Sequence, residues 1–365
     1  MSTLGEGTFG VGILGTANIA RKNILAIAQA KNVCTVVVGS RDPERARVYA
    51  EENDVPRSYG SYEEVLADGE VDGVYLPLPT TSHFEWVQKA AEKRKHILCE
   101  KPLALNAKDL LTMLRAAKAA DVAFMDGVMF MHHHRMTRLR EACSNLGPTG
   151  PRQVNTHFSF KGDASFFENN IRVSANGDPL GCVGDLGWYN VRFSLFVFNY
   201  EMPSSVRCIV HRSSDDGVPF QASGTMIWPD DDDQSLGVPL AARSATFVCS
   251  FLHTECQSAT VVGENGFIEM EDFVIPVSPS VGRFTKVKHN WGSKAQHIDA
   301  VRLDEDCHSN QTSAMWETFS AIANDAAQRP FWMEVALKTQ VVMDALMQSS
   351  QKDGEAVVLP PIQEI

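Results

Sequence analysis

The feature that most constrains the fold is a regular alternation of apolar runs and helix-like stretches over the first 130 residues. The apolar runs are six to nine residues long and read as buried strands, at residues 10–15, 34–41, 73–79, 96–102 and 122–130. Strands that alternate with helices build βαβ units, and these units assemble into a parallel, doubly wound sheet. Residues 1–130 are therefore predicted to form one α/β domain.

The pattern changes after about residue 131, where strand-like runs alternate between apolar and polar side chains. These runs lie at residues 153–160, 204–212, 244–252, 257–263 and 266–276. Such alternation is typical of antiparallel sheets. We therefore expect an α+β domain over residues 131–365, built on a large, mostly antiparallel, open sheet.

Helices and loops complete this second domain. One helix is predicted at about 184–198, and two more at 312–327 and 333–350. The sequence leaves open whether the two C-terminal helices pack back on the first domain. Residues 279–311 are polar and weakly patterned and read as a long loop, and the acidic stretch 229–234 reads as a solvated loop.

Charge and cysteine content limit the partners and the location. The 365 residues carry a formal net charge of −12, whereas nucleic-acid binding needs a basic face, so no nucleic-acid partner is expected. No run of about 18 apolar residues indicates a membrane span, and the N-terminal residues lack the pattern of a signal peptide. The eight cysteines are scattered and form no Cys-x-x-Cys pair, which is typical of reduced core thiols in a cytoplasmic protein.

A glycine-containing loop follows the first apolar run and opens the first helix. It is a variant of the G-x-G-x-x-G/A dinucleotide fingerprint, in which Gly15 makes the turn, Ala17 replaces the second glycine and Ala20 allows close helix packing. Backbone N–H groups at such a helix N-terminus bind a pyrophosphate. The alternative is a plain strand–helix turn without a ligand. The predicted cofactor contacts from this segment are Gly12, Gly15, Thr16, Ala17, Asn18 and Ile19.

The end of the second apolar run predicts which nicotinamide cofactor the loop binds. An acidic residue alone at this place indicates NAD, whereas arginine or serine indicates the 2′-phosphate of NADP. Here the residues are Ser40, Arg41 and Asp42. Asp42 precedes Pro43 and is expected to cap the next helix. Ser40 and Arg41 have no such structural task, so NADP is the predicted cofactor and NAD the alternative.

Several segments together resemble the Gfo/Idh/MocA oxidoreductases. In chain order they are VGILGTANIA, GSRDPERA, PLPTTSHFEW, HILCEKPLALN, MFMHHHR, GDLGWYN and GENGFIEM. Their order and spacing are most similar to the branch that contains dimeric dihydrodiol dehydrogenase, NADP-dependent D-xylose dehydrogenase and glucose–fructose oxidoreductase. The resemblance implies an N-terminal Rossmann domain and an enzyme that acts on CH–OH groups. It also implies further cofactor contacts at Pro79, Thr80, His83, Glu100 and Lys101, and the alternative for His83 is a residue at the start of a helix without a role in binding.

The same resemblance implies a catalytic set of three residues. The family places a catalytic residue, often a histidine, where the helix of the second domain begins, and this chain has Tyr189 there. Asp185 lies four residues earlier, so the two would share one helix face. A free tyrosine has a pKa of about 10, which a nearby ammonium lowers by favouring the phenolate. We therefore assign Tyr189 as the acid/base and Lys101 as the cation that tunes it and polarises the carbonyl. Asp185 would orient the substrate or Lys101, and the alternative for Tyr189 is a core side chain with a satisfied hydroxyl.

Four further residues are predicted to contact the substrate, namely His132, Phe160, Arg172 and Trp188. The alternative for the two aromatic residues is a place in the core. No metal site is predicted from the histidine run 132–134, because consecutive side chains point in different directions and no carboxylate lies at ligand spacing.

These observations predict an NADP-dependent dehydrogenase or reductase that transfers a hydride between the nicotinamide and a hydroxyl or carbonyl carbon of an aldose or related polyol. Two alternatives stay open: a trans-dihydrodiol dehydrogenase acting on aromatic cyclic diols, and a non-catalytic dinucleotide-binding regulator. Strand 244–252 has apolar side chains on both faces, so the open sheet is expected to pair with that of a second copy in a homodimer, and a tetramer of two such dimers is the alternative.

Overall fold

The computed structural model describes residues 7–229, 242–277, 282–288, 296–300 and 310–365. The chain forms two compact units. The first unit comprises residues 1–133, 309–337 and 364–365, and the second comprises residues 134–308 and 338–363. The first unit is therefore assembled from segments at both ends of the sequence.

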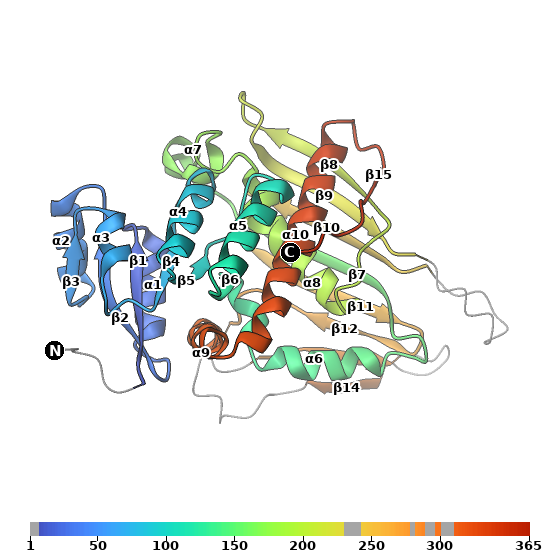
Figure 1. Ribbon diagram of the computed structural model, residues 1–365. Helices are drawn as coiled ribbons and strands as arrows, with labels where there is room; N and C mark the ends of the chain where they lie inside the picture. Colours follow the sequence, from blue (N-terminus) through green and yellow to red (C-terminus); the bar gives the residue numbers. More distant parts are fainter. Residues whose placement is uncertain (1–6, 230–241, 278–281, 289–295, 301–309) are drawn as a thin grey trace. The chain divides into compact units, whose positions relative to one another are not determined.

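A parallel sheet forms the centre of the first unit (Figure 1). Within the described residues it has six strands in the order β3-β2-β1-β4-β5-β6, and all neighbouring strands are parallel. The strands are β1 (Phe9–Leu14), β2 (Val33–Gly39), β3 (Arg57–Tyr59), β4 (Gly73–Leu76), β5 (His96–Cys99) and β6 (Phe124–Asp126). The strand order reverses between β1 and β4, and doubly wound sheets bind ligands beyond the carboxyl ends of the strands at this point.

Helices connect these strands, and side-chain caps begin most of them. They are α1 (Asn18–Ile27), α2 (Pro43–Glu52), α3 (Tyr62–Ala67), α4 (Thr80–Glu92) and α5 (Ala107–Ala119). Asp42, Ser61 and Asn106 cap α2, α3 and α5 by accepting hydrogen bonds from backbone N–H groups of the first turn. Such caps satisfy donors that have no partner inside the helix. The cap predicted at Asp42 is confirmed.

Helix α9 (Gln311–Asn324) completes the core of the first unit, although it comes from the far end of the sequence. Trp316 and Phe319 on α9 are completely buried in the same cluster as Phe9 and Ile24. The rings of Phe9 and Phe319 meet edge to face with centroids 5.6 Å apart. Each large side chain buried in this way contributes about 1.5–3 kcal/mol. The core of the first unit therefore depends on residues 311–324.

The second unit is built on a nine-stranded sheet with the order β14-β13-β12-β11-β7-β10-β9-β8-β15 within the described residues. Its strands are β7 (Pro151–Ser159), β8 (Ser205–Ser213), β9 (Pro219–Ile227), β10 (Ser244–Ser250), β11 (Cys256–Gly263), β12 (Gly266–Met270), β13 (Thr285–Lys288), β14 (Gln296–Ala300) and β15 (Val357–Val358). β7 and β10 pair in parallel, and the other neighbouring strands are antiparallel.

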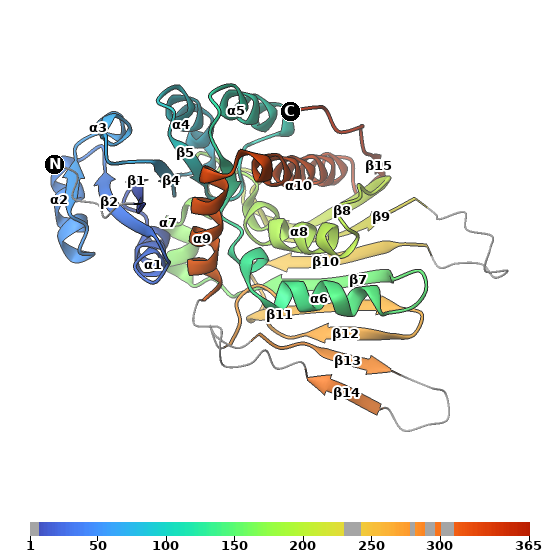
Figure 2. The ribbon, with the colours of Figure 1, turned by 60° about the horizontal axis from the view of Figure 1, so that its bottom comes forward.

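Helices cover one face of this second sheet (Figure 2). They include α6 (Arg135–Ser144) and a π-helical turn, Val183–Gly187, which continues into α8 (Trp188–Val197). Every residue of α8 is buried. A short helix α7 (Ala164–Asn169) and a 3₁₀ turn (Ile171–Val173) precede the π turn, and α10 (Arg329–Ser350) runs from the first unit into the second.

The predicted fold class is confirmed, since the chain combines a parallel doubly wound sheet with a mostly antiparallel one. Some predicted elements differ from the structure, and one is the strand predicted at 266–276, which ends at Met270. Residues 279–311 are not one long loop, because they contain β13 and β14, whose charged and polar residues concealed the strand pattern. The strand predicted at 122–130 ends at Asp126, and a 3₁₀ turn (Met129–His132) follows it.

Two sequence predictions concern features beyond the sheets. The acidic stretch 229–234 lies, except for Pro229, outside the described residues. Among the helices of the described chain, none has both the length and the apolar character required to cross a bilayer.

Candidate active site

The turn after β1 has the backbone of a phosphate-binding loop. Gly15 has a φ angle of +114°, which favours glycine, and its N–H donates to Gly39 O at 2.9 Å. A Cβ at Gly15 would lie 3.2 Å from the end of the Leu78 side chain, which is a tight contact. Ala17 is the N-cap of α1 and its side chain makes no capping bond, and the Tyr49 hydroxyl donates to Ala17 O at 3.0 Å. The N-terminus of α1 can therefore receive an anion.

The other residues predicted in this loop differ in their surroundings. Asn18 and Ile19 are exposed, whereas Thr16 is half-buried. Gly12 lies inside β1, where a Cβ would come within 2.6 Å of Val65. Close packing against α3 therefore accounts for this glycine without a ligand.

Two arginines lie near the end of β2. Ser40 is buried and its hydroxyl accepts from Asp42 N at 3.3 Å, so it supports the turn that begins α2. Arg41 and Arg45 are both exposed. Burial raises the pKa of Tyr62, while the neighbouring guanidinium groups of Arg41 and Arg45 act in the opposite direction. Positive charge therefore gathers beside the Tyr62 hydroxyl.

Tyr62 and Arg45 were not predicted from the sequence as site residues. Tyr62 is buried at the start of α3, and its hydroxyl lies 3.6 Å from the position of a Cβ on Gly15. Its ring packs edge to face on Trp86 with centroids 4.8 Å apart. Tyr62 therefore lies next to the Gly15 turn and also next to Arg41 and Arg45. No local pattern in the sequence indicates this, because Tyr62 belongs to a different βα segment.

His83 links the segments that follow β4 and β5. Its Nδ1 lies 3.0 Å from Leu103 O and its Nε2 lies 2.9 Å from Leu78 O. The side chain is 1% exposed, and burial lowers the pKa of His83 below its ordinary value. Both ring nitrogens therefore face backbone carbonyl oxygens, and the neutral imidazole donates to one of them. Two other residues predicted to contact the cofactor lie just before His83. Pro79 is the N-cap of α4, and Thr80 is its first residue.

Glu100 and Lys101 directly follow β5, at the carboxyl edge of the parallel sheet. Glu100 accepts from the Tyr75 hydroxyl at 2.5 Å. Both Glu100 and Lys101 are half-buried. Lys101 belongs to the first unit, whereas Asp185 and Tyr189 belong to the second, so the predicted pairing of Lys101 with them stays a prediction.

Within the second unit, the structure brings together Arg172, Asp185 and Tyr189. Arg172 Nε lies 2.9 Å from Asp185 Oδ1. Asp185 is on the π-helical turn, Tyr189 is on the first turn of α8, and both are buried. Asp185, followed by Asp178 and Tyr189, raises the pKa of the Arg172 guanidinium against the effect of burial. Arg172 is therefore a fixed cation beside Asp185, and Tyr189 interacts with it electrostatically.

The remaining predicted substrate residues lie in three different places. His132 stacks on Trp332 with ring centroids 4.7 Å apart, and its Nδ1 lies 3.1 Å from Thr318 Oγ1. Phe160 belongs to an aromatic cluster with Phe166 and Phe251 in the second unit. Trp188 is completely buried on α8. Their contact with a substrate stays a prediction.

Metal-binding side chains do not gather in the part of the chain that the structure describes. Among the described residues, no three or more histidine, cysteine, aspartate or glutamate side chains are grouped so that they could hold a metal ion.

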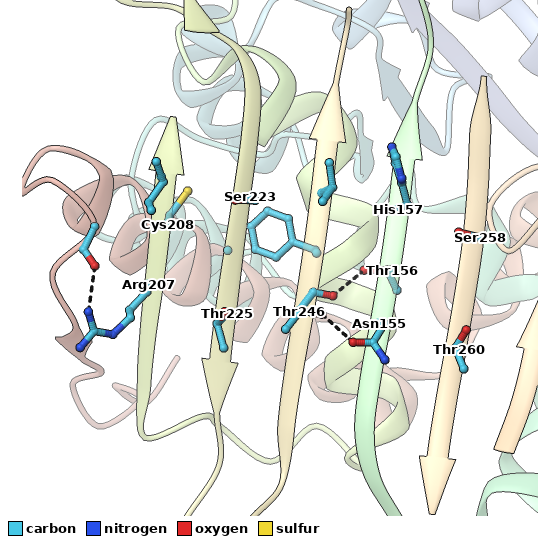
Figure 3. A pocket seen from close by; sticks show the side chains of 15 residues that line it. Asn155, Thr156, His157, Arg207, Cys208, Ser223, Thr225, Thr246, Ser258 and Thr260 are labelled. Carbon is cyan, nitrogen blue, oxygen red and sulfur yellow. Dashed lines mark hydrogen bonds between the residues drawn. The ribbon is translucent and has the colours of Figure 1, made fainter. Parts of the chain in front are cut away.

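A separate groove of about 520 Å³ lies on the sheet of the second unit (Figure 3). It is lined mainly by short polar side chains from β7 to β11, including Asn155, His157, Thr246 and Thr260. Asn155 Oδ1 accepts from Thr246 Oγ1 at 2.7 Å across two neighbouring strands. None of the predicted catalytic residues lines this groove.

The chain is similar to known oxidoreductases. Residues 9–128 match the model of a family described as an oxidoreductase family with an NAD-binding Rossmann fold. The D-xylose 1-dehydrogenase (NADP(+)) 2 of Haloferax volcanii is 34% identical over 216 residues, which cover 59% of this chain and 64% of that protein. The trans-1,2-dihydrobenzene-1,2-diol dehydrogenase of Homo sapiens is 27% identical over 238 residues, which cover 64% of this chain and 65% of that protein. The match thus spans slightly less than two thirds of each of these relatives.

A solved structure shares the fold of nearly the whole chain. The aldose-aldose oxidoreductase from Caulobacter crescentus, complexed with glycerol, superposes with a TM-score of 0.80 at 21% identity. The superposition covers 96% of this chain and 100% of that one.

Proposed function

Because residues 9–128 place the chain among the Gfo/Idh/MocA oxidoreductases, we propose that it transfers a hydride between NADP and a hydroxyl or carbonyl carbon of an aldose or related polyol. The family resemblance inferred from the sequence motifs is confirmed by this match. The observation that carries the proposed chemistry is the group of Arg172, Asp185 and Tyr189 in the second unit. It supplies a phenol that can act as an acid or, as the phenolate, as a base, and the Arg172 guanidinium interacts with it.

The proposed roles follow from the acidity of these groups. Oxidation of an alcohol removes a hydride from carbon and a proton from the hydroxyl, and the nicotinamide, when bound, supplies the carbon that takes the hydride. Tyr189 accepts the proton, and a nearby cation favours its phenolate. Lys101 is assigned as this cation and as the group that polarises the carbonyl. Asp185 fixes Arg172 by an ion pair, which supports Arg172 as a contact for the substrate.

The cofactor fits the residues of the first unit. The Gly15 turn and the N-terminus of α1 would hold the pyrophosphate, since a Cβ at Gly15 would crowd Leu78 and no side chain caps α1. Arg41 and Arg45 beside Tyr62 would hold a 2′-phosphate, which supports NADP over NAD. The D-xylose dehydrogenase relative is named as an NADP(+) enzyme.

Replacing Arg41 by alanine is expected to raise the Kd for NADP by about tenfold or more, because one charge-assisted phosphate contact is lost. The Kd for NAD should change little, since NAD lacks the 2′-phosphate. The quenching of intrinsic fluorescence during titration measures both constants. Arg47→Ala is the matched control, because Arg47 is an exposed arginine on α2, just after Arg41 in the chain, and pairs with Glu44 and Glu51. A wild-type protein that binds NAD more tightly than NADP would contradict the cofactor assignment.

The substrate class is tested by a direct comparison. NADPH formation is followed at 340 nm while the purified protein is given aldoses, polyols and an aromatic trans-dihydrodiol in parallel. Turnover of aldoses supports the proposal, and turnover of the dihydrodiol alone supports the alternative substrate, which the human relative favours. A protein that binds NADP and oxidises none of these compounds would favour the non-catalytic regulator.

The outer face of the second sheet is proposed to pair with a second copy. On β10 and in the two residues after it, Phe247, Cys249 and Phe251 are buried, whereas Val248 is half-buried and Leu252 is 38% exposed. Apolar groups thus occur on both faces of this segment, which supports an association of sheets in a homodimer.

Light scattering at micromolar concentration is expected to give twice the chain mass of 40.2 kDa. Thr246→Glu would place a charge in the groove of Figure 3 and should shift the mass toward that of a monomer. Thr112→Glu on the exposed side of α5 is the matched control and should remain dimeric. A clean monomer mass for the wild type would show that the face is not an interface.

We place the protein in the cytoplasm. The cysteines that the structure describes are Cys34, Cys99, Cys143, Cys182, Cys208, Cys249 and Cys256, and all of them are free thiols. Reduced thiols of this kind support a reducing compartment.

A further inference from the structure

A chain of hydrogen bonds runs through the first unit from α9 to Glu100. Trp316 Nε1 donates to Asn23 Oδ1 at 2.9 Å, and Asn23 Nδ2 donates to the Tyr75 hydroxyl at 2.7 Å. The Tyr75 hydroxyl then donates to Glu100 Oε1 at 2.5 Å. Trp316 and Tyr75 are completely buried, and Asn23 is 3% exposed. The path is therefore shielded from bulk water until it reaches the half-buried Glu100.

The direction of these bonds is fixed by chemistry. An indole N–H can only donate and an ionised carboxylate can only accept. The amide oxygen of Asn23 must therefore face Trp316, which turns its NH₂ group toward Tyr75. The same Asn23 Nδ2 also donates its second hydrogen to Ile19 O, within α1, at 3.1 Å. Since Tyr75 receives a hydrogen bond from Asn23, its own proton is directed to Glu100.

The network connects the parts of the first unit that are proposed to hold the cofactor. Asn23 lies on α1, whose N-terminus follows the Gly15 turn. Tyr75 lies on β4, the strand between β1 and β5. Glu100 immediately precedes Lys101. A Cβ on Gly127 would come within 3.0 Å of the Glu100 carboxylate. The carboxylate is thus enclosed between the Tyr75 hydroxyl and the backbone at Gly127.

We propose that Tyr75 is a positioning residue for the hydride transfer, because its hydroxyl holds the carboxyl group of Glu100 in place and thereby fixes the Glu100–Lys101 segment relative to the cofactor helix α1. This inference rests on the proposed function. Packing alone does not need the hydroxyl, since the ring of Tyr75 meets that of Trp316 edge to face at 5.5 Å and a phenylalanine would keep this contact. The hydroxyl is therefore explained by its hydrogen bonds, which it donates to Glu100 and accepts from Asn23.

The effect of its loss has a definite sign. A hydrogen bond to the charged form of a carboxyl group favours that form. Tyr75→Phe removes the bond, so Glu100 becomes protonated at a higher pH than in the wild type. The loss of activity on the acid side should consequently begin at higher pH, while activity at neutral pH falls because Lys101 is less well placed.

The test compares Tyr75→Phe with Tyr59→Phe. Tyr59 is the matched control because its hydroxyl also donates to a carboxylate of the first unit, Asp68, at 3.2 Å, but on β3. Tyr75→Phe is expected to lower kcat by about tenfold and to move the acid limb of the kcat profile upward by roughly half a pH unit or more, with the Kd for NADP less affected. Tyr59→Phe should retain the wild-type profile. A folded Tyr75→Phe protein with wild-type kcat and profile would overturn the inference.

A double-mutant cycle with Glu100→Gln separates positioning from a general loss of stability. If Tyr75 acts through Glu100, the double variant should be no slower than Glu100→Gln alone. If the losses of kcat in the two single variants instead multiply in the double variant, the two residues act independently and the inference is overturned. Failure of the proposed function is a different result, in which the wild type itself oxidises none of the tested substrates.

Discussion

Tyr189→Phe is expected to lower kcat by about 100-fold or more, because it removes the proposed proton acceptor without removing the ring. The ring of Tyr189 packs edge to face on Phe158 with centroids 5.5 Å apart, a contact that phenylalanine preserves. Cofactor binding should persist, since the residues proposed to hold NADP belong to the first unit. Steady-state kinetics with the substrate found in the screen, together with NADP titration, measures both effects.

Tyr200→Phe provides the matched control for this experiment. Tyr200 is a buried tyrosine of the same unit, just after α8, and its ring contacts Phe196. Removal of the Tyr200 hydroxyl in this variant should leave kcat near the wild-type value. Full activity of Tyr189→Phe would remove Tyr189 from the mechanism, whereas equal losses in both variants would point to a structural cause.

Lys101→Ala should lower kcat to a similar extent, about 100-fold or more, because the cation that favours the phenolate and polarises the carbonyl is lost. The acid limb of the profile should move to higher pH, since a phenol without its neighbouring cation gives up its proton less readily. The Kd for NADP and the melting temperature should be measured in parallel. Lys108→Ala, at an exposed position of α5, is the control for the loss of a lysine charge.

The outcome also decides which cation tunes Tyr189. The structure gives Arg172 an electrostatic interaction with Tyr189 in the second unit, whereas the role of Lys101 is a proposal from the family resemblance. A Lys101→Ala variant with a normal pH profile and reduced kcat would assign the tuning to Arg172. A variant with full activity would contradict the catalytic role of Lys101 altogether.

Features that depend on neighbouring residues were predictable from the sequence. The Gly15 turn and the cap at Asp42 are local, so a short pattern identifies both, and the structure has the expected geometry at each. The alternation of strands and helices likewise gave the doubly wound sheet. This alternation did not predict β3, because a strand of three half-buried residues is too short to show a periodicity.

Features that depend on distant residues could not be predicted. Tyr62 lies near Arg41 only because β3 and α3 return the chain to the end of β2. The helix 311–324 could be anticipated, but nothing local indicates that Trp316 bonds to Asn23. The π-helical turn that carries Asp185 has no recognisable composition, although an α-helical spacing from Asp185 to Tyr189 was a reasonable approximation.

The dependence of the first unit on α9 has a consequence for synthesis on the ribosome. The ribosome translates the cluster around Phe9 and Ile24 early. It reaches Trp316 and Phe319, which cover this cluster, roughly 10–40 s after residue 130 at ordinary elongation rates. During this interval the nascent nucleotide-binding unit exposes an apolar surface that no earlier segment covers in the native fold. We therefore expect a fragment that stops before residue 311 to be prone to aggregate, because it lacks the residues that cover this surface.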